Sequence, residues 1–564
     1  MLKNYFPLLL LSVFIACEPA QEPSSAKADT VIRNAKIYTV DESQPNAEAV
    51  AIKDGKIVFV GSNEEAASWT EAETELIDLG GKTMIPGFIE SHAHFLGIGK
   101  LKTEIDFAGT ESYNEIITLV EEAVMAAEPG EWITGRGWHQ SKWKSLPEMM
   151  VQGFPTHHLL SAVSPDNPVY IRHASGHAAL ANAKAMEIAG VNAETEFDET
   201  GEVIKGLDGE PTGLMNEEAE QLIGKHIPIE EAEMRAWAAA AAKECLANGI
   251  TTVHDAGVGT EWMDLYEDLL QEENLPVRLY VMLNGKDQAQ LEDWYKRGPL
   301  LDDYLTVRSI KCYADGALGS YGALLLQPYT DAPSELGNPD QPFPIITKIA
   351  QEGLQNGFQV CTHAIGDRAN QEVLNSYQAA IEANPEQAMD HRFRIEHAQH
   401  LDLEDIPRFA ELGVIASIQG IHMSSDRPWA INRLGEQRIL DGAYVWQKLL
   451  DSGAKVINGT DAPVEPVSAI ACFYASVTRQ TLQGTPTGGY EADQRMSRAE
   501  ALKSYTLDAA YGGFQEDTKG SIEVGKLADL TVLSQDIMEI PENEILNTEI
   551  EYTIVGGEIR YKKE

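Results

Sequence analysis

The middle of the chain alternates short apolar runs with longer stretches whose apolar residues recur at helical spacing. Helical stretches at 231–248, 349–357 and 371–384 separate apolar runs of four to seven residues. This alternation is typical of strand–helix units built around a parallel sheet. The strand-like runs lie at 84–89, 250–254, 277–281, 307–312, 358–363, 393–397, 414–418 and 454–458. Eight parallel strands close a barrel, so residues 85–514 are predicted to form one.

The two chain ends show a different pattern, with short alternating strands and tight glycine turns. Such strands run through residues 31–84, and the pattern returns at 525–533 and 552–561. We therefore expect the two ends, 31–84 and 515–564, to pair into one small β domain. The interval 96–249, which follows the first barrel strand, is predicted to be an insertion. It contains two further strand-like pieces, at 132–135 and 169–172.

The first residues are more apolar than the rest of the chain. Lys3 precedes an apolar run at 6–16, which is far shorter than the roughly 20 residues that span a bilayer and is followed by Cys17. Residues 1–17 thus read as a signal peptide whose end resembles the lipobox of bacterial lipoproteins, and 18–30 reads as a tether. We expect export to the bacterial cell envelope, with membrane attachment through a lipid on Cys17. The alternative is an incidental cysteine in a signal peptide that is cut elsewhere.

Charge and cysteine content exclude several classes of function. The chain has 43 Lys and Arg against 88 Asp and Glu, a formal net charge of -45, which repels nucleic acid and anionic membrane surfaces. We therefore expect no nucleic-acid partner. The remaining cysteines are far apart in sequence and indicate neither a disulfide framework nor a thiolate metal site. They are Cys245, Cys312, Cys361 and Cys472.

Polar residues of metal-ligand type gather where the predicted barrel strands end. They are His92 and His94 after strand one, Lys311 on strand four, His363 on strand five, His397 on strand six and Asp461 after strand eight. Because catalytic side chains converge at the carboxyl face of such a barrel, we expect these residues to meet. Imidazole and carboxylate ligands suit zinc with one open position. Any one of them alone could instead be a cap or a hydrogen-bonded core residue.

Five motifs resemble those of the amidohydrolase superfamily and, more narrowly, its amidohydrolase-3, YtcJ-like branch. They are Pro86–His94, Lys311–Gly319, Thr362–Asp367, Ile395–Gln399 and Gly459–Val464. The likeness extends over nearly everything after residue 30. It implies an α/β fold in which a distorted TIM-type (β/α)8 barrel lies beside a β-sandwich made of 31–84 and 515–564.

The resemblance also implies a metal centre, which we expect to hold two zinc ions. Its implied ligands are His92, His94, His363, His397 and Asp461, with Lys311 carboxylated as a bridge between the two ions. A carbamate at Lys311 has a physical logic, because a protonated lysine among dications would be repelled whereas a carbamate anion offsets their charge. The alternative is an ordinary Lys311 that forms a salt bridge with Asp315.

The function implied is metal-dependent hydrolysis of non-peptide carbon–nitrogen bonds in N-acyl, N-formyl or cyclic amides. Asp461 resembles the family's strand-eight acid and is expected to take a proton from the attacking water and pass it to the leaving amine. One alternative on the same fold is a deaminase with a single metal and an unmodified Lys311. An alternative of another class is a non-catalytic lipoprotein that binds a ligand where the metal site has lapsed.

Substrate contacts are predicted in the insertion, in the stretch after strand seven and at one helical arginine, and His177 and His422 lie in polar loops expected on the catalytic face. The candidates are Trp138, His177, Gln419, His422, Asp426 and Arg479. Core packing is the alternative for Trp138, and a structural ion pair is the alternative for Arg479. The acidic, proline-containing stretch 327–345 is expected to cover the pocket or to be a solvated excursion. We expect a small amide-type molecule as substrate and keep a homodimer as an option.

Overall fold

The computed structural model describes residues 27–140, 143–174, 178–197 and 201–564. The predicted signal peptide with Cys17, the tether up to residue 26, and His177 lie outside these residues. Within the described ranges, no helix combines the length and apolar character that crossing a bilayer requires.

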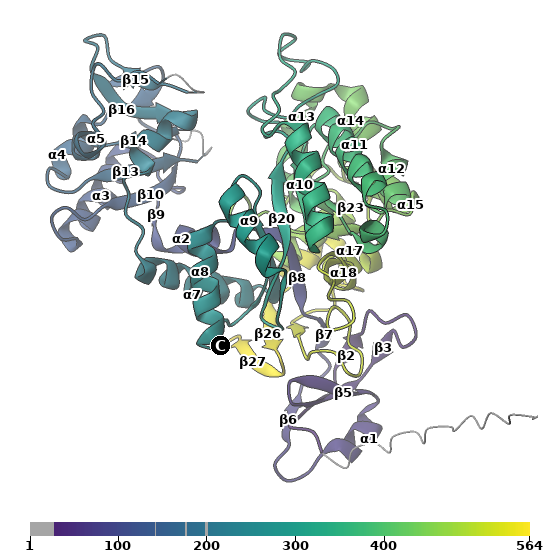
Figure 1. The fold of residues 1–564 in the computed structure, drawn as a ribbon. Helices are drawn as coiled ribbons and strands as arrows, with labels where there is room; N and C mark the ends of the chain where they lie inside the picture. Colours follow the sequence, from purple (N-terminus) through teal and green to yellow (C-terminus); the bar gives the residue numbers. More distant parts are fainter. Residues whose placement is uncertain (1–26, 141–142, 175–177, 198–200) are drawn as a thin grey trace, which may run out of the picture.

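Eight parallel strands form the central sheet, and their neighbours follow chain order (Figure 1). The strands are β8 (Phe88–Ala93), β17 (Ile250–Val258), β18 (Arg278–Asn284), β20 (Leu305–Tyr313), β21 (Gln359–Ala364), β22 (Arg394–His397), β23 (Ile415–Ile418) and β24 (Val456–Asn458). A parallel bridge between Ala93 and Ala462 brings the segment after β24 back to β8. The backbone N–H of Asp461 also donates to His92 O at 2.8 Å. The sheet is therefore a nearly closed barrel, and the predicted TIM-type fold is confirmed.

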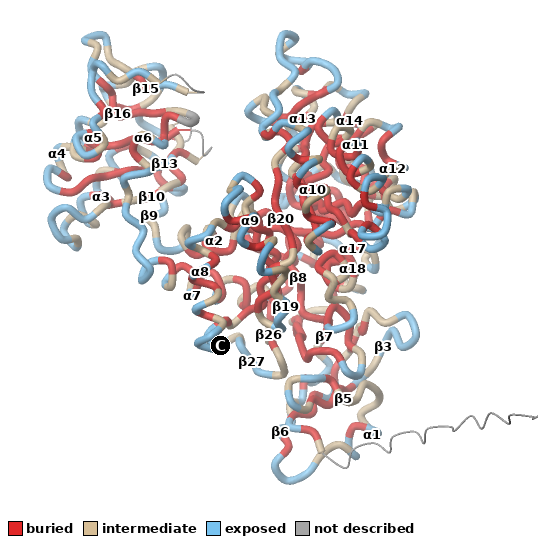
Figure 2. Tube along the Cα trace, in the orientation of Figure 1, coloured by how far each residue is buried: buried red, intermediate tan, exposed pale blue. Residues whose placement is uncertain are grey.

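Helices surround the barrel, which explains why its strands are apolar along nearly their whole length. Helix α10 (Phe343–Asn356) is typical: Ile346, Ile349 and Leu354 face the core, and the helix ends at Gly357 in the left-handed conformation. The other outer helices are α2 (Phe95–Thr103), α7 (Glu231–Ala247), α8 (Thr260–Gln271), α9 (Gln288–Arg297), α11 (Asp367–Ala383), α12 (Ile406–Leu412), α13 (Gly420–Leu434), α14 (Glu436–Gly442), α15 (Trp446–Asp451), α16 (Ala469–Thr478), α17 (Arg498–Ser504) and α18 (Leu507–Gly512). Figure 2 shows the buried residues concentrated between these helices and the strands.

Two further sheets contain the strands of the chain ends. One has the order β5-β4-β1-β6, and the other β27-β26-β25-β7-β2-β3. Their strands are β1 (Thr30–Arg33), β2 (Lys36–Tyr38), β3 (Asn46–Ala47), β4 (Ala49–Lys53), β5 (Lys56–Gly61), β6 (Glu75–Asp78), β7 (Thr83–Pro86), β25 (Leu530–Leu533), β26 (Ile550–Val555) and β27 (Glu558–Lys562). Both sheets contribute to one apolar cluster, in which Ile52 of the first lies with Val532 of the second. The second sheet thus joins strands from both ends of the chain.

The first barrel strand differs from its predicted position. Residues 83–86 form β7 in the terminal sheet, and the barrel strand β8 begins only at Phe88. Gly87 separates the two, and a Cβ there would lie 2.4 Å from side-chain atoms of Thr251, so only glycine permits this approach. His92 consequently lies within the first barrel strand rather than after it.

The insertion is smaller than predicted. A six-stranded sheet lies apart from the barrel (Figure 1) and has two apolar clusters of its own. Its strands are β9 (Ile105–Asp106), β10 (Ile133–Trp138), β13 (Val169–His173), β14 (Ala178–Ala181), β15 (Val203–Lys205) and β16 (Pro211–Asn216), with helices α3 (Tyr113–Ala126), α4 (His158–Val163), α5 (Ala183–Ala189) and α6 (Gln221–Gly224). Helices α2 and α7, at the two ends of the predicted interval, pack in the barrel core instead. The inserted domain is therefore residues 105–224.

A buried ion pair joins the amino-terminal end of barrel strand β18 to the segment that begins β25 of the terminal sheet. Arg278 begins β18, and its Nε and Nη2 donate to Asp529 at 2.7 and 2.9 Å. Both side chains are almost fully buried, and the N–H of Gly556 also donates to Asp529 at 2.8 Å. Burial alone would raise the pKa of Asp529, but Arg278, and after it Lys519, hold that pKa below its usual value. Removal of Arg278 therefore takes the main compensating charge away from a buried carboxylate.

Arg278→Ala should therefore lower the free energy of unfolding by about 3–5 kcal/mol. Urea denaturation followed by tryptophan fluorescence measures the change. Arg560→Ala, at an exposed arginine of β27, is the matched control. A variant no less stable than that control would show that this ion pair does not hold the barrel to the terminal sheet.

Candidate metal centre

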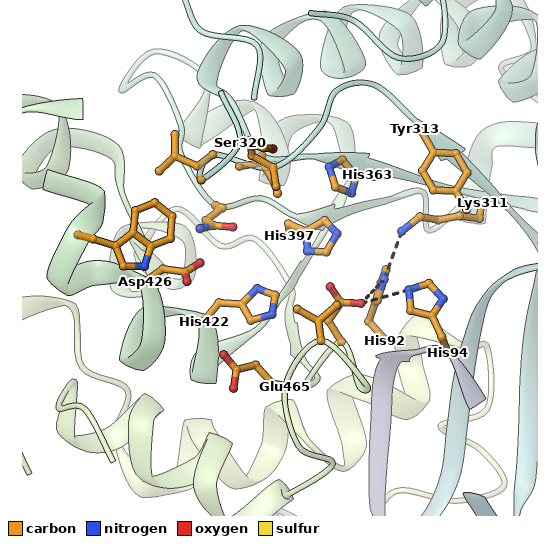
Figure 3. Close-up of a pocket in the computed structure, with 18 residues that line it drawn as sticks. His92, His94, Lys311, Tyr313, Ser320, His363, His397, His422, Asp426 and Glu465 are labelled. Atoms are coloured by element: carbon orange, nitrogen blue, oxygen red, sulfur yellow. Dashed lines mark hydrogen bonds and ion pairs between the residues drawn. The ribbon is translucent and has the colours of Figure 1, made fainter. Parts of the chain in front are cut away.

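The six residues predicted as metal ligands line one cavity of about 650 Å³, formed from the carboxyl ends of the barrel strands (Figure 3). They are His92 on β8, His94 directly after it, Lys311 on β20, His363 on β21, His397 at the end of β22 and Asp461 after β24. The order of strands in the sheet thus brings together residues that are hundreds of positions apart in sequence.

Asp461 lies at the middle of the arrangement. Its Oδ1 is 3.3 Å from His94 Nε2 and 3.5 Å from His92 Nε2. One group of ligand atoms, from His92, His94 and Asp461, falls within 4.8 Å of one another, and a second group joins His397 and His422 to the same Asp461. Two candidate positions for a cation therefore share this carboxylate.

Three of the imidazoles are fixed through the nitrogen that faces away from the cavity. Nδ1 of His92 is 2.5 Å from Glu396 Oε2, and Nδ1 of His94 is 3.0 Å from Ala256 O. Nδ1 of His397 is 2.7 Å from Gln419 Oε1. Engaging Nδ1 leaves Nε2 of each ring as the atom available to a metal. Gln419, predicted as a substrate contact, thus positions a ligand.

The backbone is unusual at two of the predicted ligands. His397 has φ 77° and Asp461 has φ 59°, a left-handed region that residues other than glycine adopt rarely. Such conformations cost on the order of 1–3 kcal/mol each and persist where the surroundings enforce them. His397 ends β22 and Asp461 lies three residues after β24, and both side chains line the cavity. Figure 3 shows the ring of His397 directed into it.

A buried ion pair beneath the cavity was not predicted from the sequence. Arg394 and Glu396 lie on β22, fully buried, with Arg394 Nε 2.7 Å from Glu396 Oε1. Nη2 of Arg394 also donates to Ser91 O at 2.6 Å and to Ser417 Oγ at 3.1 Å. This guanidinium offsets the charge of the carboxylate that orients His92. Two opposite charges at positions i and i+2 of a strand predicted to lie inside the barrel are the signal that reveals such a pair.

A second buried acidic side chain, Glu90, connects the first barrel strand, β8, with the segment that follows the last one, β24. Glu90 accepts hydrogen bonds from the N–H of His92 at 3.2 Å and from the N–H of Thr460 at 2.7 Å. Burial raises the pKa of Glu90 to about 8. One side chain therefore holds the backbone at two strands that carry predicted ligands.

Burial controls the protonation of the ligands. It lowers the pKa of His92 to about 4 and that of His363 to about 3, with the nearby Lys311 amine acting in the same direction. Burial also lowers the pKa of Lys311. Burial alone would raise the pKa of Asp461, but the hydrogen bond from His94 and the neighbouring imidazoles hold it well below its usual value. Burial alone would lower the pKa of His94, but its contact with Asp461 raises that pKa above the usual value. Neutral His92 and His363 are in the protonation state that a metal requires.

Atoms without partners test whether these residues fit a metal. The Nε2 of His363 is buried and has no hydrogen-bond partner within the described part of the chain, and the Oδ1 of Asp461 faces the Nε2 atoms of His94 and His92 at 3.3 and 3.5 Å. Leaving such atoms unpaired is costly, and a divalent cation bound by nitrogen and oxygen would satisfy them. The donor set therefore fits a metal of this kind.

The Nζ of Lys311 lies 3.2 Å from His92 Nε2, at the edge of the ligand cluster. The alternative of a salt bridge to Asp315 does not match the structure. Asp315 instead accepts the backbone N–H groups of Leu324, Ile365 and Gly366 at 2.8–3.0 Å. Its Oδ1 is also 3.5 Å from His363 Nε2.

The predicted substrate contacts separate into two groups. His422 and Asp426 line the cavity, as do Tyr313, Trp429 and Glu465, which were not predicted. Trp138 lies in the core of the inserted domain, where its Nε1 donates to Ile171 O at 3.1 Å, so core packing accounts for it.

For Arg479 the structure matches the alternative of an ion pair, and the stretch 327–345 contributes no residue to the cavity lining as described. Arg479 is fully buried outside the cavity lining, donates to the carbonyls of Tyr444 and Tyr490, and pairs with Glu491. Its position is that of a structural ion pair, because every donor is directed into the protein. Residues 317–320 of the loop after β20 line the cavity, whereas none of 327–345 belongs to its described lining.

Comparisons with known proteins agree with this arrangement. Residues 75–561 match the profile of the Amidohydrolase family. The chain is 32% identical to the putative amidohydrolase YtcJ of Bacillus subtilis, over 93% of this chain and 98% of that protein. It is 27% identical to the N-substituted formamide deformylase of Arthrobacter pascens, over 95% of this chain and 98% of that protein. The crystal structure of an uncharacterized metal-dependent hydrolase from Pyrococcus furiosus superimposes with a TM-score of 0.76 at 27% identity, covering 90% of this chain and 100% of that one.

Glu396→Gln should weaken metal binding by about 10–100-fold, because the neutral amide holds His92 less firmly than the carboxylate does. Titration of the metal-stripped protein against a chelator of known affinity measures the loss. Glu404→Gln, at an exposed acid on the loop before α12, is the control. A thermal melt of the same samples separates weaker binding from a loss of fold, and equal affinity in both folded variants would contradict the role of Glu396.

Proposed function

The chain belongs to the amidohydrolase family and is a metal-dependent hydrolase acting on carbon–nitrogen bonds, and from this premise we propose that it hydrolyses non-peptide amides. N-formyl and N-acyl amines and cyclic amides are the proposed substrates. One observation carries the proposal: six residues of metal-ligand type, from five barrel strands and the segments after them, line a single cavity. The deformylase relative supports the choice of formamides, since it shares its length with this chain.

We propose two divalent ions, with zinc as the metal. His92, His94, His363, His397 and Asp461 would hold them, and Asp461 belongs to both candidate positions. Lys311, as a carbamate, would bridge them. Its burial supports this assignment, because a lowered pKa favours the neutral amine that reacts with carbon dioxide. The carbamate anion would then lie among cations rather than in an apolar core.

When bound, such a metal lowers the pKa of water from about 16 towards about 7 and polarises a carbonyl. The chain supplies the rest of the chemistry. Asp461 is held as a carboxylate, so it can accept a proton from the attacking water and return it to the leaving nitrogen. His94 and His92 approach its Oδ1 from one side.

Asp461→Asn should retain metal but lose about 100-fold or more in kcat on N-formyl and N-acyl amines, because an amide cannot accept the proton. Amine release measures turnover, and elemental analysis measures metal in the same samples. Asp402→Asn, at a solvated acid after β22, is the control. Near wild-type turnover in a metal-loaded Asp461→Asn protein would remove Asp461 from this role.

Reconstitution of the metal-stripped protein tests the carbamate. Activity should return faster when zinc is added with bicarbonate than when it is added in carbon dioxide-free buffer, because the bridge needs carbon dioxide. The metal content with bicarbonate should reach about two ions per chain. Lys311→Arg, which keeps the charge but cannot form this carbamate, should show no bicarbonate dependence. Equal recovery of the wild-type protein in both buffers would contradict the modification.

A further inference from the structure

The catalytic cavity has a second polar region, away from the predicted metal ligands. Asp426 on α13 and Glu465 after β24 line the cavity together with Trp429. In Figure 3 both carboxylates lie beyond His422, on the side away from Lys311 and His94. The cavity thus has a ligand cluster at one end and two carboxylates with an indole at the other.

These carboxylates face the cavity without a positive partner. Among the described lining residues, Lys311 is the one lysine or arginine, and it belongs to the ligand cluster. Arg427, next to Asp426 in the chain, is 2.7 Å from Glu491 instead. Arg479, expected from the sequence to meet a substrate carboxylate, is paired with that same Glu491. The nearby guanidinium groups are therefore already compensated, and the wall of the cavity is acidic.

His422 lies between the two ends and is not among the ligands proposed for either ion. Its side chain is more than nine-tenths buried, and its Nε2 has no hydrogen-bond partner among the described residues. It lines the same cavity as Asp426 and Glu465. Asp426 accepts a hydrogen bond from Ser425 Oγ at 3.4 Å, but neither carboxylate has a lysine or arginine partner among the described residues. A buried ring nitrogen without a partner beside these two carboxylates is costly unless a polar ligand enters this end of the cavity.

We propose that Asp426 and Glu465 form a subsite for a cationic group, an inference that rests on the proposed function. The preferred amides would then carry an ammonium-type substituent. The scissile amide lies at the ligand cluster, and the cation lies at the carboxylates with the face of Trp429 available to it. Amides that carry a free carboxylate are disfavoured, because the described lining contains no arginine, and its one lysine, Lys311, belongs to the ligand cluster. The net charge of -45 also attracts cations to the protein.

Three formamides of equal chain length test this specificity: a monoformylated linear diamine, the neutral N-formyl alkylamine and the N-formyl ω-amino acid. The metal-loaded wild-type protein should prefer the cationic amide over the neutral one by roughly tenfold in kcat/KM, mainly through KM, and salt should reduce the preference. The anionic amide should be the poorest. Equal kcat/KM for all three, or preference for the anionic amide, would overturn the proposal.

Two variants connect the preference to these side chains. Asp426→Asn and Glu465→Gln should each reduce the cationic-to-neutral ratio several-fold, and the double variant should abolish it. Glu436→Gln, at an exposed acid that begins α14, is the control and should keep the wild-type ratio. An unchanged ratio in both single variants, or the loss of one bound metal ion in the double variant, would show that the carboxylates serve another purpose.

Calorimetric binding of the monoformylated diamine distinguishes failure of the subsite from failure of the proposed function. If no amide is hydrolysed, the proposed function fails. Weaker binding to Asp426→Asn than to Glu436→Gln would then still support the subsite. Equal binding to both variants would overturn the subsite whatever the reaction is.

Discussion

The arrangement of the catalytic face depends on one buried ion pair, Arg394 with Glu396. Glu396 fixes the ring of His92, and Arg394 compensates the carboxylate while reaching the carbonyl of Ser91 on β8 and the hydroxyl of Ser417 on β23. A fully buried charge is tolerated only where an opposite charge and hydrogen bonds compensate it. The same contacts therefore set the spacing of three strands and the direction of a ligand. The geometry of the centre follows from the need to keep this pair satisfied.

The sequence was sufficient for features that depend on local pattern. Apolar runs bounded by helical stretches predicted the number of barrel strands and the positions of all but the first, because strands covered by helices on the outside must be apolar along their length. The polar residues at their ends were found for the same reason, since parallel strands direct their carboxyl ends to one face. Asp461 and His92 therefore meet as expected, although 369 positions separate them (461 minus 92).

Features that depend on contacts distant in sequence could not be predicted. The break at Gly87 follows from the approach of Thr251, which no local pattern reveals. Trp138 and Arg479 were assigned to the pocket from residue type alone, and the structure places them in the inserted domain and in a pair with Glu491. The acidic end of the cavity was predicted only in part, because Asp426 was named as a substrate contact and Glu465 was not. Whether these carboxylates can bind a cation depends on which arginines are already paired, and only the three-dimensional arrangement decides that.

The seam of the barrel has a consequence for its durability. Strands β8 and β24 meet through the bridge between Ala93 and Ala462, and His92 and Asp461 lie on opposite sides of that join. A metal held by both residues is a cross-link between the first and last strands, closing a loop of several hundred residues. Because loop closure restricts the unfolded chain, part of the binding free energy becomes folding free energy. Loss of the metal would therefore weaken the barrel where β8 meets β24. The supply of metal would then determine the stability of the protein as well as its activity.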